Sequence, residues 1–135
     1  MRRVRLLVVL CLLCGYCPGC GSGIDVTPTR GVVQYEGKSL AGGRIILTPI
    51  HGGKPAFGTI QADGSFVLTT ERTDDGAVPG KHRVTVVGDL KIQGKEVHMT
   101  FLAPREFSVE VVPDKKNDLL VNISQDDGWQ ETADD

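Results

Sequence analysis

Residues 57–69 read FGTIQADGSFVLT, and this stretch determines the class of fold. At its centre Asp63-Gly64 predicts a compact turn, because aspartate bonds its own backbone and glycine tolerates a positive φ. After the turn Phe66 and Leu68 share one face of the chain, and the residues that alternate with them share the other. This period of two is typical of a half-buried β-strand, so the stretch predicts a β-hairpin.

The same alternation recurs along the chain on both sides of this hairpin. Runs rich in Val, Ile, Thr and Phe are separated by clusters of Gly, Pro and Asp, and no helical periodicity competes with them. The expected strands cover residues 32–35, 44–48, 57–61, 66–69, 82–87, 97–101, 107–111 and 119–123. We therefore predict an all-β fold, an antiparallel β-sandwich of about seven or eight strands. Its core is expected to be lined by Val33, Tyr35, Ile45, Leu47, Phe66, Leu68, His82, Val84, Val86, Val97, Met99, Phe101, Phe107, Val109, Val111, Leu119, Val121 and Ile123.

The first residues of the chain are typical of a signal peptide. Arg2, Arg3 and Arg5 form a positive segment, and the eight residues Leu6–Leu13 form an uninterrupted apolar run. Eight helical residues cover only about 12 Å of a bilayer core that is about 30 Å thick. We therefore assign residues 1–19 to a signal peptide and expect no permanent transmembrane helix there.

Cys20 follows Pro18-Gly19 at the end of the apolar segment and precedes a Gly-Ser-Gly tether. In this position it resembles the lipobox cysteine of bacterial lipoproteins, although Cys17 stands where that family usually has leucine. The resemblance implies that Cys20 is diacylated on sulfur and becomes the first residue of the mature chain. It also implies a lipoprotein of the cell envelope, held on a membrane by its lipid and facing the periplasm or the exterior. Ordinary signal-peptidase cleavage near the same place is the alternative.

The charge and cysteine content exclude several other classes of protein. All four cysteines, Cys11, Cys14, Cys17 and Cys20, lie in the leader segment, and no neighbouring His or acidic residue would complete a metal site with them. Cleavage before Cys20 would leave 12 of the 15 basic residues against 17 acidic ones, a net charge of -5 without an intrachain disulfide. A nucleic-acid partner is not expected for such a chain.

The mature chain divides into three parts. Residues 20–29 are expected to form a lipidated tether, because they are mostly Gly, Ser, Thr and Pro. Residues 30–124 form the sandwich domain. Residues 125–135 carry five acidic residues and no Lys or Arg, which predicts a disordered acidic tail.

Three stretches resemble a known family of domains: GVVQYEGKSLAGGRIILTP at 31–49, ADGSF at 62–66 and PGKHRVTV at 79–86. They are similar to the transthyretin-like, carboxypeptidase regulatory-like domains of small bacterial lipoproteins. Ser39 replaces the proline of the family pattern, and His82 stands where an inward Tyr or Phe is common. The resemblance implies a transthyretin-like sandwich over about residues 30–124. The shared residues are turn glycines and inward apolar residues, so they indicate a fold and no particular activity.

The candidate chemical groups do not form a recognisable site in the sequence. His51, His82 and His98 lack the close spacing of metal-ligand motifs, and we interpret His82 as a histidine at the edge of the core. Asp74-Asp75, together with Asp63, could offer oxygen ligands to calcium, but they lack calcium-loop spacing. Turn chemistry accounts for these aspartates, so neither a metal nor a cofactor is expected.

Enzymatic activity is not expected either. 5-Hydroxyisourate hydrolase has a transthyretin-like fold, but its family ends in Tyr-Arg-Gly-Ser, whereas this chain ends in ETADD. Lys38 and Asn122 could form an intramolecular amide bond, as in pilin domains, only if the lysine were buried beside the asparagine and an acid. No nucleophile motif is present.

These observations predict a non-enzymatic lipoprotein that displays a β-sandwich as a structural or protein-binding module in the cell envelope. The alternative is a secreted carbohydrate-binding or hydrolase-accessory domain. That function would need exposed aromatic side chains, whereas Trp129, the one tryptophan, lies in the expected tail and Tyr35 is expected to point inward. The ligand, the oligomeric state and the choice of membrane are not encoded in any motif.

Overall fold

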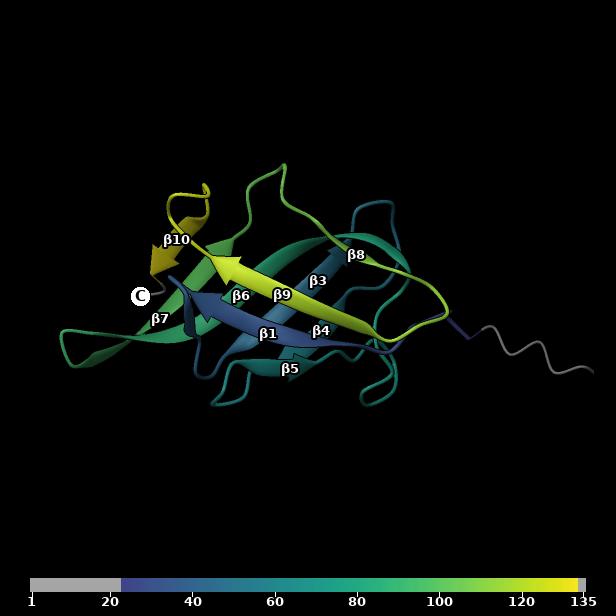
Figure 1. The fold of residues 1–135 in the computed structure, drawn as a ribbon, viewed down its shortest axis with the longest axis horizontal. Helices are drawn as coiled ribbons and strands as arrows, with labels where there is room; N and C mark the ends of the chain where they lie inside the picture. Colours follow the sequence, from purple (N-terminus) through teal and green to yellow (C-terminus); the bar gives the residue numbers. More distant parts are fainter. Residues whose placement is uncertain (1–22, 134–135) are drawn as a thin grey trace, which may run out of the picture.

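The computed structural model describes residues 23–133, and these residues form two β-sheets packed face to face (Figure 1). No helix occurs among them, so the predicted all-β sandwich is confirmed. Eight of the strands overlap the predicted ranges, and β2 and β10 were not predicted. The strands are β1 (Thr29–Tyr35), β2 (Lys38–Ser39), β3 (Arg44–Pro49), β4 (Ala56–Thr59), β5 (Ser65–Val67), β6 (Gly80–Ile92), β7 (Lys95–Leu102), β8 (Val109–Val111), β9 (Asn117–Ile123) and β10 (Gln130–Ala133).

The small sheet is built around β1. Strands β2 and β5 pair with β1 in the antiparallel direction, whereas β9 pairs with it in parallel from Thr29↔Asn117 to Tyr35↔Ile123. The predicted sandwich was entirely antiparallel, so this parallel pair is a correction. It arises because the chain leaves the small sheet after β5, forms β6, β7 and β8 in the large sheet, and only then returns to the side of β1.

The large sheet has the order β10-β7-β6-β3-β4. The sequence predicts a central strand at residues 82–87, and β6 takes that place, pairing with both β3 and β7. The first residues of β6 pair with β8. Its 13 residues run past the end of β3, so β6 and β7 continue as a hairpin arm at one end of the molecule (Figure 1).

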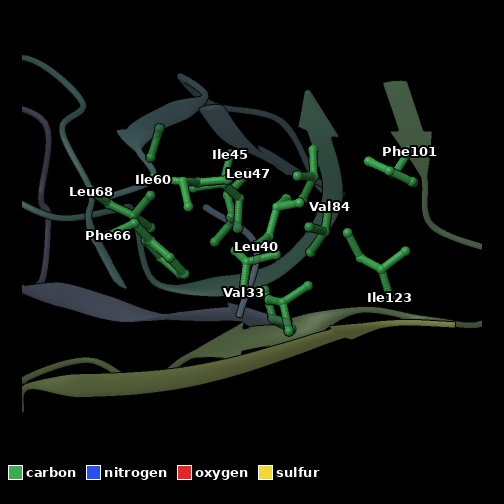
Figure 2. Packing of buried hydrophobic residues seen from close by; sticks show 14 of the residues in the cluster. Val33, Leu40, Ile45, Leu47, Ile60, Phe66, Leu68, Val84, Phe101 and Ile123 are labelled. Carbon is green, nitrogen blue, oxygen red and sulfur yellow. The ribbon is translucent and has the colours of Figure 1, made fainter. Parts of the chain in front are cut away.

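The core lies between the two sheets, and the predicted inward residues line it. All of them are buried or half-buried in the structure. Phe66 from the small sheet and Phe101 and Val84 from the large sheet are at most 1% exposed, and Figure 2 shows such side chains meeting between the layers. Each fully buried side chain of this size contributes about 1.5–3 kcal/mol.

Gly31 allows β1 to lie close to its neighbours in the core. A Cβ atom at this position would lie 2.3 Å from the carbonyl oxygen of Leu119 and 2.7 Å from Cζ of Phe66. The Leu119 carbonyl belongs to the backbone of β9, so it cannot move without disturbing the β1–β9 ladder. A side chain is therefore excluded where the two parallel strands and the Phe66 ring meet.

The predicted turn at Asp63-Gly64 is present. Gly64 has a φ of 83°, and the Asp63 carboxylate accepts hydrogen bonds from the backbone N–H and the hydroxyl of Ser65, at 3.0 and 2.5 Å. These two bonds lower the pKa of Asp63, with the Ser65 hydroxyl as the larger cause.

Residues 125–133 do not form the disordered tail that the composition predicts. Gln130–Ala133 form β10, which pairs with β7, and Trp129 is 5% exposed with its ring 5.3 Å from that of Phe107. The acidic side chains indicate only that most of this segment is exposed to solvent. The one buried tryptophan nevertheless attaches the segment to the sandwich. The disorder prediction is therefore wrong for these residues.

The domain also begins earlier than predicted. Thr27 and Thr29, in the segment expected to be a free tether, are 4% and 2% exposed. The Thr27 backbone exchanges two hydrogen bonds with that of Ala77, at 2.8 and 3.1 Å. Only the part of the expected tether that precedes Thr27 can therefore act as a spacer between Cys20 and the domain.

Candidate functional site

Cys20, the predicted lipid-attachment residue, and the signal segment lie outside the described residues. Residue 23 begins the described chain, and the segment ahead of β1 extends from the end of the sandwich opposite the β6–β7 arm (Figure 1). Along residues 23–133 the chain forms no helix with the length and apolar character required to traverse a lipid bilayer.

The three histidines lie in three different environments. His51 is exposed in the loop after β3, and Nδ1 of His98 on β7 is hydrogen-bonded to the carboxylate of Asp89 on β6. His82 is fully buried on β6, where its Nδ1 lies 3.0 Å from the carbonyl oxygen of Gly80 and its Nε2 has no partner in the described protein. Burial lowers the pKa of His82, and the contact with Gly80 offsets part of this effect. His82 thus occupies the core position that the sequence predicts.

Two of the aspartates considered for calcium, Asp63 and Asp75, accept hydrogen bonds from backbone N–H groups. The Asp75 carboxylate accepts hydrogen bonds from the backbone N–H groups of Thr70 at 2.7 Å, Arg72 at 2.8 Å and Glu71 at 3.0 Å. Desolvation raises the pKa of Asp75, but these donors outweigh it and the net shift is downward. Within residues 23–133 no group of three His, Cys, Asp or Glu side chains is arranged to hold a metal ion.

The Lys38–Asn122 pair lacks the environment that an intramolecular amide bond needs. Lys38 on β2 and Asn122 on β9 are both exposed; Lys38 pairs with Tyr35 of β1, whereas Asn122 pairs with Gln34 from the other side of β1. Water therefore solvates the lysine side chain. The structure does not bring these residues together as a reacting pair.

Two of the aromatic side chains are unavailable as a sugar-binding platform. Trp129 packs on Phe107, and the Tyr35 ring lies 5.4 Å from that of Phe101. Burial, followed by the neighbouring Glu131, raises the pKa of Tyr35. Phe57, by contrast, is 41% exposed on β4.

Phe57 belongs to a groove at the corner where β4 of the large sheet meets β5 of the small sheet. The groove has a volume of about 1060 Å³, and its residues come from both sheets and from the loop after β5. Val67 of β5, which is 45% exposed, also lines it. Two large apolar side chains are therefore available to a ligand along one continuous hollow.

The middle of the β4–β5 hairpin is open along this groove. Phe57 and Thr69 exchange two backbone hydrogen bonds, at 2.9 and 2.8 Å, and the Gln61 N–H donates to the Ser65 carbonyl at 2.8 Å. Thr59 and Val67 occupy the position between these two pairs, but β4 and β5 form no ladder pair there.

The hairpin opens because its two strands belong to different sheets. Thr59 pairs with Arg44 in the large sheet, whereas Val67 pairs with Arg30 in the small sheet. The two ladders draw the strands apart at the position where Thr59 and Val67 would otherwise bond. Unpaired backbone N–H and C=O groups seek a partner, which is water or a ligand.

Both arginines reach the groove, but only one of them is neutralised by a neighbour. Nε of Arg30 lies 2.6 Å from the carboxylate of Asp118, and both side chains are 67% exposed. Arg44 forms no ion pair with any described residue. Asp74 lies in the same lining. The groove thus combines apolar side chains, open backbone groups and charges of both signs, which is the chemistry that recognises a polypeptide segment.

The sequence did not reveal this groove. The alternation of residues 57–69 predicts a hairpin, but it does not show that the two strands join different sheets. The signal available in the sequence was that Phe57 shares a strand face with the polar residues Thr59 and Gln61, and not with a second apolar residue. Comparisons of the chain with protein-family models, with curated proteins and with solved structures find no match.

Proposed function

We propose that this protein is a membrane-anchored lipoprotein of the cell envelope whose transthyretin-like domain binds a segment of another protein, without catalysis. The observation that carries the binding proposal is the groove at the β4–β5 corner, where Phe57 and Val67 are exposed beside unpaired backbone groups. Apolar contacts next to backbone donors and acceptors suit an extended peptide chain.

The family resemblance is supported by the places its glycines occupy. Gly37 and Gly64 have φ values of 75° and 83° in the turns after β1 and before β5, and Gly80 has a φ of 120° at the start of β6. Residues other than glycine are disfavoured at such angles. The turns at these three motif positions therefore favour glycine, which supports the resemblance.

The anchor proposal rests on Cys20 and the tether after it. Seven residues from Cys20 to the first paired residue, Thr27, reach at most about 25 Å. An acylated Cys20 would hold the domain within this distance of the membrane surface. More than one acyl chain is needed for stable anchoring, and diacylation supplies it.

The anchor is tested by detergent-phase partitioning of the expressed chain, with mass spectrometry of its N-terminal peptide. We expect wild type to enter the detergent phase with more than one acyl chain on Cys20, and Cys20→Ala to remain in water. A water-soluble, unmodified wild type would overturn the lipid proposal and leave the groove proposal intact.

The groove is tested by placing a photo-reactive amino acid at Val67 in cells that make the protein. Ile92 on the β6–β7 arm is the matched control, because the two side chains are 45% and 46% exposed. We expect a specific adduct with another protein from position 67 alone, and we expect Phe57→Asp to abolish it. Equal labelling from both positions would contradict the proposal. Saturable binding of a cell-wall glycan that Phe57→Asp abolishes would instead favour the carbohydrate-binding alternative.

A further inference from the structure

The edge of the small sheet at β9 is open. Among the described strands β9 pairs only with β1, so it is an edge strand of the small sheet (Figure 1). The Asn117 N–H donates to the Pro28 carbonyl, and the Ile123 carbonyl accepts from the Glu36 N–H, both at 2.9 Å. The odd-numbered residues of β9 therefore direct their backbone groups toward β1.

Successive residues of a strand direct their backbone groups to opposite sides. The N–H and C=O groups of Asp118, Leu120 and Asn122 therefore point outward from the sheet. No backbone hydrogen bond joins these groups to any residue of the described chain. β9 thus presents a regular row of three donors and three acceptors along its seven residues.

This edge lacks the features that usually prevent a strand from pairing further. Protected edges carry lysine, proline or a bulge. β9 has none of these within Asn117–Ile123, and its register with β1 is unbroken. Its one charged side chain, Asp118, is paired with Arg30, while Leu120 is 65% exposed at the middle of the strand.

We infer that this edge binds a second copy of the same chain, with the two β9 strands antiparallel and related by a two-fold axis at Leu120. In that register Leu120 faces Leu120 of the other copy, and Asp118 of each copy faces Asn122 of the other. All the outward donors and acceptors on both strands are then satisfied. The contact is isologous and closes at a dimer.

The side chains of β9 are complementary to a second, antiparallel β9, which favours another copy of the chain as the partner. Apolar residues oppose apolar ones, because Leu119 faces Val121 just as Leu120 faces Leu120. The two Asp118 carboxylates lie at opposite ends of the paired segment, so no like charges are directly opposed. Cross-strand pairs of this kind are favourable, whereas opposed like charges are not.

Disulfide trapping between introduced cysteines tests the pairing and its register. The full chain is used, in cells that make the protein. Two opposed residues of an antiparallel hydrogen-bonded pair have Cα atoms about 5.5 Å apart, within the range that a disulfide spans. We expect Leu120→Cys to shift the protein to a dimer band on a non-reducing gel. Leu102→Cys, at a position that is 41% exposed on β7, should stay monomeric.

The register gives a second measurement that chance collisions cannot imitate. The single variants Asp118→Cys and Asn122→Cys should each remain monomeric. The chain that carries both substitutions should form a disulfide-linked dimer. A Leu120→Cys chain that dimerises no more than Leu102→Cys would overturn the inference. So would self-trapping of Asp118→Cys, because it requires a different register. Leu120 does not line the β4–β5 groove, whereas Asp118 does, so a failure of Leu120→Cys to dimerise overturns the dimer inference and leaves the proposed function untouched.

Discussion

Replacing Trp129 by alanine should destabilise the whole domain, although the residue lies in an acidic segment near the C-terminus. Trp129 is 5% exposed, packs with a tilted ring against Phe107 and directly precedes β10. If it anchors β10 to the sandwich, its loss releases both the ring contact and the β10–β7 ladder. If the segment were a disordered tail, the substitution would have no effect on unfolding.

The magnitude follows from the buried area. A tryptophan buries about 150–250 Å², which at about 25 cal/mol per Å² corresponds to roughly 4–6 kcal/mol. This value is an upper bound, because an unfolded chain already covers part of the side chain. Measured losses for buried Trp→Ala changes are about 3–5 kcal/mol, and we expect about 3 kcal/mol here because β10 is a short edge strand. That is a large part of the 5–15 kcal/mol that is typical of a domain.

Urea unfolding of wild type and Trp129→Ala, followed by circular dichroism, measures this loss. Trp129→Phe is the matched control, since it keeps an aromatic ring against Phe107 and should lose less. Fluorescence gives an independent reading on the unaltered protein, because Trp129 is its one tryptophan. The native emission should lie at shorter wavelength than the emission in urea, and it should change together with the circular dichroism.

A loss below about 1 kcal/mol for Trp129→Ala would refute this reasoning, because it is the size of an ordinary surface change. Native emission identical to that in urea would refute it as well, since it would place the indole in water. Either result would restore the disordered tail that the composition predicts.

Three further outcomes are expected. Gly31→Ala should cost about 1–3 kcal/mol by overpacking against Leu119, while Gly23→Ala, where an added Cβ meets nothing within 4 Å, should change the melting temperature little. His82→Phe should remove a pH dependence of the free energy of unfolding. The pKa of His82 in the folded protein lies below its unfolded value of about 6.5. Wild type therefore loses stability as the pH falls below 6.5, by up to about 1.4 kcal/mol per pH unit. Urea unfolding at pH 7.5 and pH 5 would contradict this if both proteins lost the same amount. Asp75→Ala should lower the free energy of unfolding by about 1–2 kcal/mol and speed proteolysis of residues 70–76, because three backbone N–H donors lose their acceptor. Cleavage at the wild-type rate would show that the Asp75 carboxylate does not hold this loop.

Much of the fold was predictable from local pattern. Strand alternation depends only on which side chains prefer water, so it identified the inward set, including His82. The turn at Asp63-Gly64 was predictable for a similar reason, since it depends on two adjacent residues. Composition failed for residues 125–133, because a single buried tryptophan outweighs the solvated acids around it.

The candidate sites were not predictable in this way. His51, His82 and His98 were identified as residues, but only the structure shows that His82 is sealed in the core while His98 meets Asp89. The groove and the β9 edge both consist of backbone groups left without partners. Side-chain patterns carry no information on which backbone groups remain free.

The sequence by itself determined that this protein is an all-β sandwich with a defined inward face, because hydrophobic periodicity and turn chemistry act over a few neighbouring residues. Only the tertiary structure decided that β9 lies parallel to β1, that β4 and β5 separate into different sheets, and that Trp129 closes the core. Each of these outcomes depends on pairing between segments distant in the chain, and many such pairings satisfy the same alternation. The choice among them is made by the packing of both sheets together.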